Sequence, residues 1–210
     1  MSGTLLRAEE AAAAAAARRT EPRHAAAAAG GAADEQLLSA LMGQSARQEA
    51  CLTERLASLR LLVSYWEAGD VKKMLQHLQR IDDPSVAVDI VNAGVLTGGR
   101  LDLECALVVL PLLDSLLGST YEEHTLAALQ AVSQVVASFG PLIRNTRALA
   151  RDTLGVDLSA EARQQRCQAC FEQLAAMVPR LRQLAAGKGK AKYAAKSLLV
   201  ELRSGAGLAC

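Results

Sequence analysis

Cys167 and Cys170 form the arrangement in this sequence that has the clearest chemical precedent. Two cysteines at this spacing hold zinc when two further ligands complete a tetrahedron, and they exchange disulfides when they begin a helix that follows a strand. The sequence contains no second CxxC and no HxxxH. Both cysteines fall within an apolar helical stripe, so we predict buried free thiols that pack as small hydrophobic side chains. A CxxC redox enzyme is the alternative, and thiol titration distinguishes the two.

Motifs for phosphate transfer and for nucleophilic catalysis are missing from the sequence. Residues 187–192, GKGKAK, lack the preceding strand and the magnesium-binding hydroxyl of a phosphate-binding loop. No serine stands in a nucleophile elbow. The acidic pairs at 82–83 and 122–123 suit helix caps and first turns, with Ser119 and Glu122 as a capping box. We therefore predict that the protein is not an enzyme and uses no cofactor or metal.

Aliphatic residues supply most of the core material. Hydrophobic residues make up 51% of the sequence and aromatic residues 3%, which argues against the stacking platforms that bind single-stranded nucleic acid. Apolar residues recur at helical spacing, and no stretch alternates as a strand would. We expect an all-α fold, an antiparallel, solenoid-like stack of helices. The five cysteines, an odd number spread over several elements, are typical of a reducing cytosol.

Glycine, aspartate and proline predict where helices end and begin. Gly69 should end one helix, and Asp70 should cap the next. Asp83 and Pro84 should begin a third. Further helices are expected over 101–117, 119–143, 159–186 and 193–203, and the first of these is expected to be central because it is apolar on most sides. Residues 187–192 should form a flexible basic link.

Three of these helices contain proline, which lacks a backbone N–H and crowds the preceding turn. Pro111 and Pro179 are expected to bend their helices, and Gly140 with Pro141 is expected to kink or break the helix over 119–143. The uncharged window 124–143 is long enough to span a bilayer. Its threonine, glutamine and serine residues indicate a core helix instead.

An apolar stripe precedes Gly69. Its members alternate at steps of four and three, which places them on one helical face; they are Leu52, Leu56, Leu59, Val63 and Trp66. Trp66, the only tryptophan, suits either the core or an interface centre, where tryptophan is enriched. The helices before Gly69 and after Asp70 should form a hairpin, and we predict that this hairpin binds a partner helix. The candidate contacts are Leu59, Val63, Trp66, Met74 and Leu75.

Charge is distributed unevenly, although the formal net charge is only +1. Residues 1–143 carry 11 basic and 17 acidic side chains, whereas residues 144–210 carry 12 and 5. A cationic C-terminal third favours an acidic partner, such as a microtubule surface, nucleic acid or anionic lipid. One hypothesis is therefore an unrelated α-helical adaptor that binds nucleic acid or anionic membrane through this third. Ordinary solubility is the other explanation of the charge.

Two blocks of residues carry a resemblance to a known family. The first comprises Trp66, Gly69-Asp70, Ser85-Val86, Val88-Asp89 and Asn92; the second comprises Gly155-Val156-Asp157-Leu158-Ser159, Glu161, Arg163, Cys167, Cys170, Phe171 and Leu174. In this order they resemble the conserved C-terminal domain of the katanin regulatory subunit, the non-catalytic partner of a microtubule-severing ATPase. The resemblance extends from about Leu37 to Leu202.

The resemblance implies a regulatory role in microtubule severing. The domain would bind the N-terminal helical domain of the catalytic AAA subunit, and the pair would bind microtubules in the cytoplasm, at the spindle pole or basal body. Neither membrane nor nucleic acid would be a partner. The residues expected to contact microtubules are Arg144, Arg147, Arg151, Arg163, Arg166, Lys188, Lys190 and Lys192.

The domain boundaries follow from composition and from the resemblance. Residues 1–36 contain two alanine runs and should form a disordered or partly helical tail, because alanine offers little apolar surface for docking. Residues 37–203 should form the helical domain, and 204–210 a flexible C-terminus. The β-propeller that precedes this domain in the family has no counterpart in the sequence, so we expect either a propeller-less form or a fragment.

Overall fold

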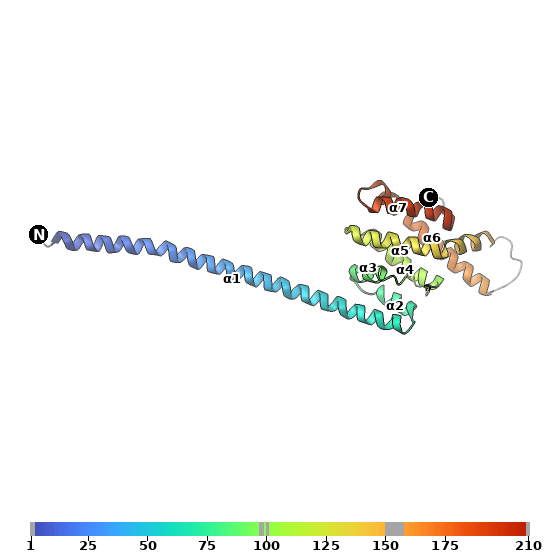
Figure 1. Cartoon of the computed structure of the whole chain (residues 1–210), viewed down its shortest axis with the longest axis horizontal. Coiled ribbons are helices and arrows are strands. Elements are labelled where there is room, and N and C mark those ends of the chain that lie inside the picture. The colour runs from blue at the N-terminus through green and yellow to red at the C-terminus, as the bar shows by residue number, and fades with distance from the viewer. Residues whose placement is uncertain (1–2, 97–98, 100, 150–157, 209–210) are drawn as a thin grey trace. The chain divides into compact units, whose positions relative to one another are not determined.

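The computed structural model describes residues 3–96, 99, 101–149 and 158–208, and within them it contains helices and no strand. The α-helices are α1 (Gly3–Glu67), α2 (Val71–Leu78), α3 (Pro84–Asn92), α4 (Leu103–Leu117), α5 (Glu122–Leu149), α6 (Leu158–Ala186) and α7 (Ala191–Glu201). A short π-helix, η1 (Leu202–Ala206), follows α7 directly. The prediction of an all-α fold is confirmed (Figure 1).

The chain divides into two compact units, residues 1–54 and residues 55–210. From residue 3 onward the first unit is the N-terminal part of α1, so residues 3–36 are helical; a disordered or partly helical tail was expected. Alanine has the highest intrinsic helix propensity, which accounts for helix in a segment with few large apolar side chains. The second unit contains the end of α1 and all the later elements.

The second unit begins with a helical hairpin whose turns match the prediction. Gly69 has a φ of 78°, the left-handed conformation that glycine adopts without steric cost. The Asp70 carboxylate accepts a hydrogen bond from the Lys73 N–H at 3.1 Å and so caps α2. The Asp83 carboxylate accepts one from the Ser85 N–H at 2.9 Å, with Pro84 in the first turn of α3. These caps set where each short helix starts.

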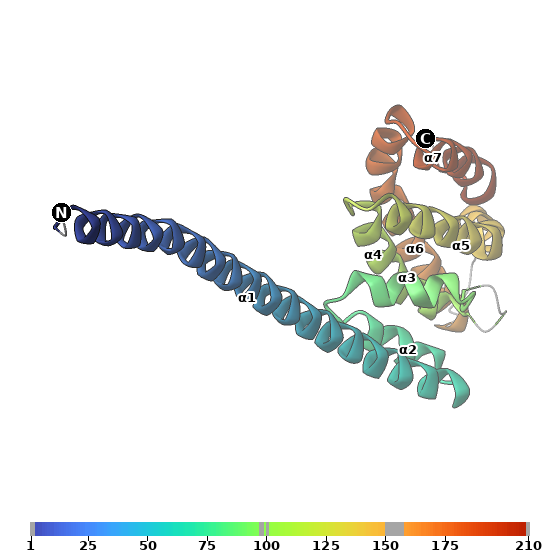
Figure 2. The same ribbon diagram turned by 60° about the vertical axis from the view of Figure 1, so that its left-hand side comes forward.

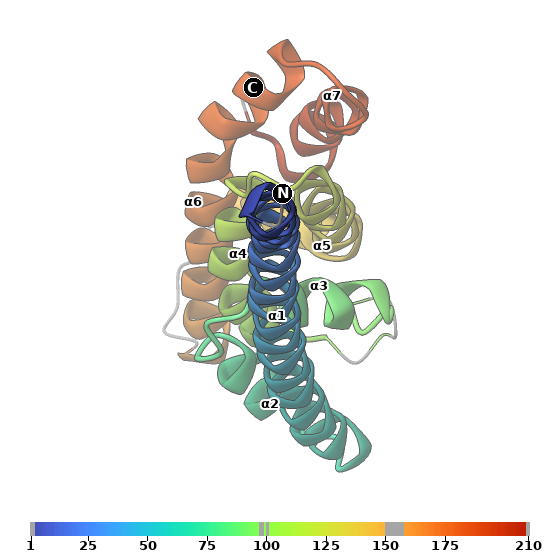
Figure 3. The ribbon, with the colours of Figure 1, turned by 90° about the vertical axis from the view of Figure 1, so that its left-hand side faces the viewer.

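The core of the second unit is almost entirely aliphatic. α5 packs against α3, α4, α6, α7 and η1, whereas α4 packs against α2, α5 and α6. The central helix of the unit is therefore α5, and not α4 as the sequence predicted. Figure 3 shows α6 running alongside α4. Residues 122–148 of α5 are long and apolar enough to cross a membrane, but half of the apolar window is buried within the fold. Its side chains therefore serve the core, as predicted.

Proline interrupts none of the long helices. Pro111, Pro141 and Pro179 lie inside α4, α5 and α6, each with its ring at the surface, and each helix continues past it. α5 is thus not broken at Gly140 and Pro141, where a kink or a break was expected. Gly140 has another use, because a Cβ there would lie 3.1 Å from the Gly205 carbonyl carbon. Its missing side chain lets η1 approach α5 closely.

The C-terminal residues are packed where a flexible end was expected. Ala206 and Leu208 are buried, and the Arg144 guanidinium on α5 donates a hydrogen bond to the Ser204 carbonyl at 2.5 Å. The side chains of Ala206 and Leu208 and the carbonyl of Ser204 thus all contact the folded unit. Residues 204–208 belong to the domain.

Glu122 ties the start of α7 to the start of α5. Its carboxylate accepts hydrogen bonds from the N–H groups of Lys190 at 2.7 Å and Ala191 at 3.4 Å, instead of closing the predicted capping box with Ser119. Gly189 precedes this contact with a φ of 89°, and a Cβ there would overlap the Glu122 carboxylate. One carboxylate therefore stabilises the positive ends of two helices.

Candidate functional site

The last turns of α1 expose part of the predicted apolar stripe. Leu56 and Val63 are each 47% exposed, whereas Leu59 and Trp66 are half-buried and pack against the core. Large aliphatic side chains this exposed on one helical face are typical of a surface that a partner covers. We call Leu56, Leu59, Val63 and Trp66 the α1 stripe.

Met74 and Leu75, which were also candidate partner contacts, lie in the chain's own core. Their exposed fractions are 0% and 1%, so a partner could reach them only if α2 left its position. Their burial within the chain could not be predicted from the helical pattern. Helical periodicity predicts which residues share a face, but it does not say whether that face meets another part of the same chain or a second protein.

An ion pair holds the end of α1 against α3. The Arg55 Nε and Nη2 atoms donate to one carboxylate oxygen of Asp89 at 2.8 and 2.5 Å. Leu62, one turn before Trp66, is fully buried, and the Tyr65 ring lies 5.9 Å from the His77 ring on α2. Sequence reasoning assigned no role to Arg55 or Asp89, although Asp89 lies in the first block of the resemblance. Together these contacts fix the orientation of the α1 stripe.

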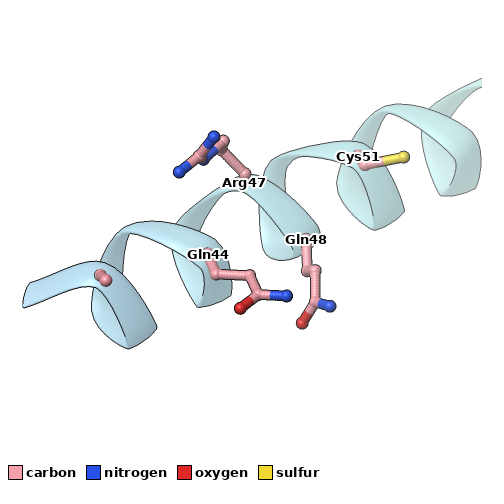
Figure 4. Close-up of a pocket in the computed structure, with 5 residues that line it drawn as sticks. Gln44, Arg47, Gln48 and Cys51 are labelled. Carbon is pink, nitrogen blue, oxygen red and sulfur yellow. The ribbon is translucent and has the colours of Figure 1, made fainter. Parts of the chain in front are cut away.

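A second feature lies in the first unit, on α1 itself. Figure 4 shows Gln44, Arg47, Gln48 and Cys51 along this helix, and Ala40 completes the lining of a shallow hollow. All five residues come from one helix, and the Arg47 Nε donates back to the Gly43 carbonyl at 3.1 Å. The hollow is an open helix surface, and no second element contributes a group that would orient a ligand.

The basic residues near the junction of α5 and α6 are largely occupied by contacts within the fold. Arg166 forms an ion pair with Glu104 at 2.6 Å, and Glu104 also pairs with Lys72. The Lys72 ammonium, and then Arg166, lower the pKa of the Glu104 carboxyl below its usual value. This network joins α2, α4 and α6, so the charge of Arg166 is neutralised locally.

Two neighbouring arginines on α5 also make specific contacts. The Arg147 guanidinium lies 3.3 Å from the centroid of the Phe171 ring, a cation–π contact, and its Nε donates to Gln168 at 3.1 Å. Arg144 binds the Ser204 carbonyl. Arg163 is exposed on α6. Arg151 lies outside the described residues. We call Arg144, Arg147 and Arg163 the arginine group.

Lys188, Lys190 and Lys192 lie elsewhere on the molecule. Lys190 contacts Glu122, the first residue of α5, whereas Arg144 lies 22 residues later on the same helix. At 1.5 Å per residue this separates the two positions by about 33 Å. The lysines, which we call the lysine group, and the arginine group are therefore two separate basic surfaces.

Three cysteines of the second unit, Cys105, Cys167 and Cys170, are buried. Cys167 and Cys170 are fully buried, and burial raises the pKa of Cys170 to about 12. Burial likewise raises the pKa of Cys105 on α4 to about 11. Within the described part of the chain, no group of three or more histidine, cysteine or acidic side chains is placed to hold a metal ion. The predicted burial of the CxxC pair is confirmed.

Thiol titration of the folded protein at pH 8 is expected to show slow reaction of Cys105, Cys167 and Cys170. All three are buried from the reagent, and the Cys170 thiol, with a pKa of about 12, is ionised in about one molecule in 10,000 at pH 8, where the thiolate is the reactive form. The exposed Cys51 should react quickly. The measurement is the time course with a chromogenic disulfide, for wild type and for a variant without Cys51 and Cys210. Fast reaction of two thiols in that variant would support the redox alternative.

Comparison with known proteins decides the family. The model of the con80 domain of katanin matches residues 45–202, about three quarters of the chain. This chain belongs to the katanin con80 family. The resemblance predicted from the two residue blocks is thereby confirmed, and the con80 match ends where η1 begins.

Individual relatives agree with the con80 assignment. The chain is 30% identical over 150 residues to a katanin p80 WD40 repeat-containing subunit B1 homolog, KTN80.3, from Arabidopsis thaliana, covering 70% of this chain and 18% of that protein. It is 31% identical over 139 residues to katanin p80 WD40 repeat-containing subunit B1 from Xenopus tropicalis, covering 66% and 21%. It is 27% identical over 107 residues to mouse KATNB1-like protein 1, covering 48% and 35%. This con80 chain thus spans about a fifth of the p80 relatives.

Proposed function

We propose that this chain is a regulatory, non-catalytic module of the katanin system that binds the N-terminal helical domain of the catalytic AAA subunit. The pair would bind microtubules in the cytoplasm, at the spindle pole or basal body, and modulate their severing. The con80 family match supports this role, because relatives of the chain are named as katanin p80 subunits. The exposed α1 stripe supplies a surface that suits a partner helix.

The α1 stripe supports this proposal through its chemistry. Helix-in-groove recognition uses apolar anchors spaced along one helical face, and Leu56 and Val63 present such a face at the surface. Arg55 and Asp89 fix the backbone that carries them. A preorganised surface loses less conformational freedom on binding than a mobile one, which favours affinity.

Direct binding of the purified chain to the N-terminal domain of a katanin catalytic subunit tests the proposal. Isothermal titration calorimetry should show a saturable complex with one copy of each chain and a negative heat-capacity change, the sign of buried apolar surface. A monomeric helical bundle of similar size serves as the control titrant. An absence of binding at concentrations of about 100 µM would contradict the proposal, because specific interfaces bind more tightly.

Microtubule binding by the complex is expected to depend on both basic surfaces. Replacing Lys188, Lys190 and Lys192 by glutamate should weaken co-sedimentation by about tenfold or more, because the tails of tubulin are acidic. Added salt should weaken wild-type binding as well, since charges separated by more than about 8 Å are screened at physiological ionic strength. If co-sedimentation changed neither with added salt nor with these lysine-to-glutamate substitutions, the contact with microtubules would belong to the catalytic partner.

The arginine group should behave differently in the same assay. Arg144→Glu and Arg147→Glu also remove the contacts to Ser204 and Phe171, so they should lower the stability of the con80 domain as well as its binding. Arg163→Glu is the matched variant, because Arg163 is exposed. It should lower binding with the midpoint of thermal unfolding unchanged.

A further inference from the structure

A hollow of about 340 Å³ lies where the middle of α5 meets the end of α7 and η1. α5 is in contact with both of these elements, and Figure 2 shows α7 beside α5. The residues that line the hollow are Ser133, Val136, Ala137, Pro141, Glu201, Ser204 and Gly205. None of these residues belongs to the α1 stripe or to either basic surface, so the function proposed above does not use this site.

Pro141 leaves a backbone acceptor without its helical donor at this hollow. In an α-helix the N–H of residue 141 would bond to the carbonyl of residue 137, and proline has no N–H to give. Ala137 and Pro141 both line the hollow and both are exposed. The Ala137 carbonyl therefore lacks the donor that position 141 supplies in a helix without proline.

The hydroxyl groups of the lining donate their protons to other groups of the chain. The Ser133 hydroxyl donates to one carboxylate oxygen of Glu201 at 2.5 Å, and the Ser197 hydroxyl donates to the other at 3.1 Å. The Ser204 hydroxyl donates to the Val200 carbonyl at 3.1 Å. The lining side chains thus present oxygen lone pairs and no free proton, which makes the hollow a site for a hydrogen-bond donor.

Of the residues that line the hollow, Glu201 is the one that carries a charge. Glu201 is half-buried, and among the described residues no lysine, arginine or histidine forms an ion pair with its carboxylate. A carboxylate has about four lone-pair sites, and the two serines use two of them. A cation that entered the hollow would therefore gain a charge-assisted hydrogen bond without displacing an existing partner.

We propose that this hollow binds the ammonium group of a lysine side chain that a partner protein presents. An ammonium has three rotatable donors, which can reach the Glu201 carboxylate, the Ala137 carbonyl and the lone pairs of Ser133. The methylene stem would lie against Val136 and the Pro141 ring.

The test uses two capped tripeptides that differ only in the ammonium group: alanine-lysine-alanine and alanine-norleucine-alanine. Titration into the full ¹⁵N-labelled chain is expected to shift the amide signals of Ala137, Ser204 and Gly205 saturably with the lysine peptide. The norleucine peptide should bind at least about tenfold more weakly, since a hydrogen bond between charged groups is lost. Equal effects of the two peptides, or no saturable shift with either, would overturn the proposal.

Two variants test the acceptors separately. Glu201→Gln keeps an oxygen for Ser133 but removes the charge, and Pro141→Ala supplies the N–H that bonds to the Ala137 carbonyl within α5. Each should weaken lysine-peptide binding about threefold or more, and Pro141→Ala should not harm the fold, because alanine favours helix. Pro179→Ala, the same change on α6, is the matched control and should bind as wild type. Unchanged binding in both Glu201→Gln and Pro141→Ala would overturn the assignment.

Discussion

Replacing Val63 by aspartate is expected to abolish binding of the catalytic subunit's N-terminal domain while the con80 domain stays folded. Val63 is 47% exposed, so in the free chain the new carboxylate remains hydrated. In the complex it would be buried against apolar atoms without a partner, which costs about 3 kcal/mol or more for a charged group. That corresponds to at least about a hundredfold loss of affinity. Calorimetric titration measures the affinity, and circular dichroism on heating measures the fold.

Val200→Asp is the matched control for this experiment. Val200 is 67% exposed, and it lies on α7 instead of α1. The same substitution there introduces the same charge and should leave binding of the catalytic subunit unchanged. If Val63→Asp bound within about threefold of wild type, the α1 stripe would not be the interface. If Val200→Asp lost binding as well, the effect would come from charge in general and not from the α1 stripe.

Replacing Met74 by alanine is expected to lower the free energy of unfolding by about 2–5 kcal/mol. Met74 is fully buried on α2, and its removal would leave a cavity that the surrounding aliphatic side chains fill only in part. Urea denaturation followed by circular dichroism measures this change as a lower midpoint with the same slope. Because the folded form keeps the α1 stripe intact, partner affinity corrected for the folded fraction should be unchanged.

Gln76→Ala on the exposed face of α2 is the control for Met74→Ala. It removes a polar side chain that contacts water, and its effect on the free energy of unfolding should stay within about 0.5 kcal/mol. The alternative outcome is also informative. If Met74→Ala kept wild-type stability but lost the catalytic subunit, then Met74 would be a partner contact, as the sequence alone predicted, and α2 would have to move on binding.

The two α1–α2 predictions show how the stability and the binding of this hairpin are divided. One face of each helix is apolar, but on α1 the fold buries Leu62, which the predicted stripe did not include. The hairpin buries Leu62 and Met74 in the core and leaves Leu56 and Val63 at the surface. Mutations on the first set should act through folding, and mutations on the second through binding. Measuring both quantities for every variant separates the two effects.

Local signals in the sequence determined the helix boundaries that depend on single residues. Gly69, Asp70, Asp83 and Pro84 end or begin helices where they were expected to, because capping needs only the side chain and the backbone of the next turn. The all-α class and the con80 family could also be predicted, because helical periodicity and the spacing of a set of residues can be recognised without any knowledge of packing. The burial of Cys167 and Cys170 followed from the same periodicity.

Only the tertiary structure decided which groups meet across the chain. Glu122 binds the start of α7 instead of capping its own helix, and Gly140 serves close packing against Gly205 instead of breaking α5. The basic residues of the C-terminal third fall on two separate surfaces, because Glu122 and Arg144 lie about 33 Å apart along α5. These outcomes depend on contacts between residues more than 60 positions apart, and a local pattern carries no information about which distant group fills the space beside it.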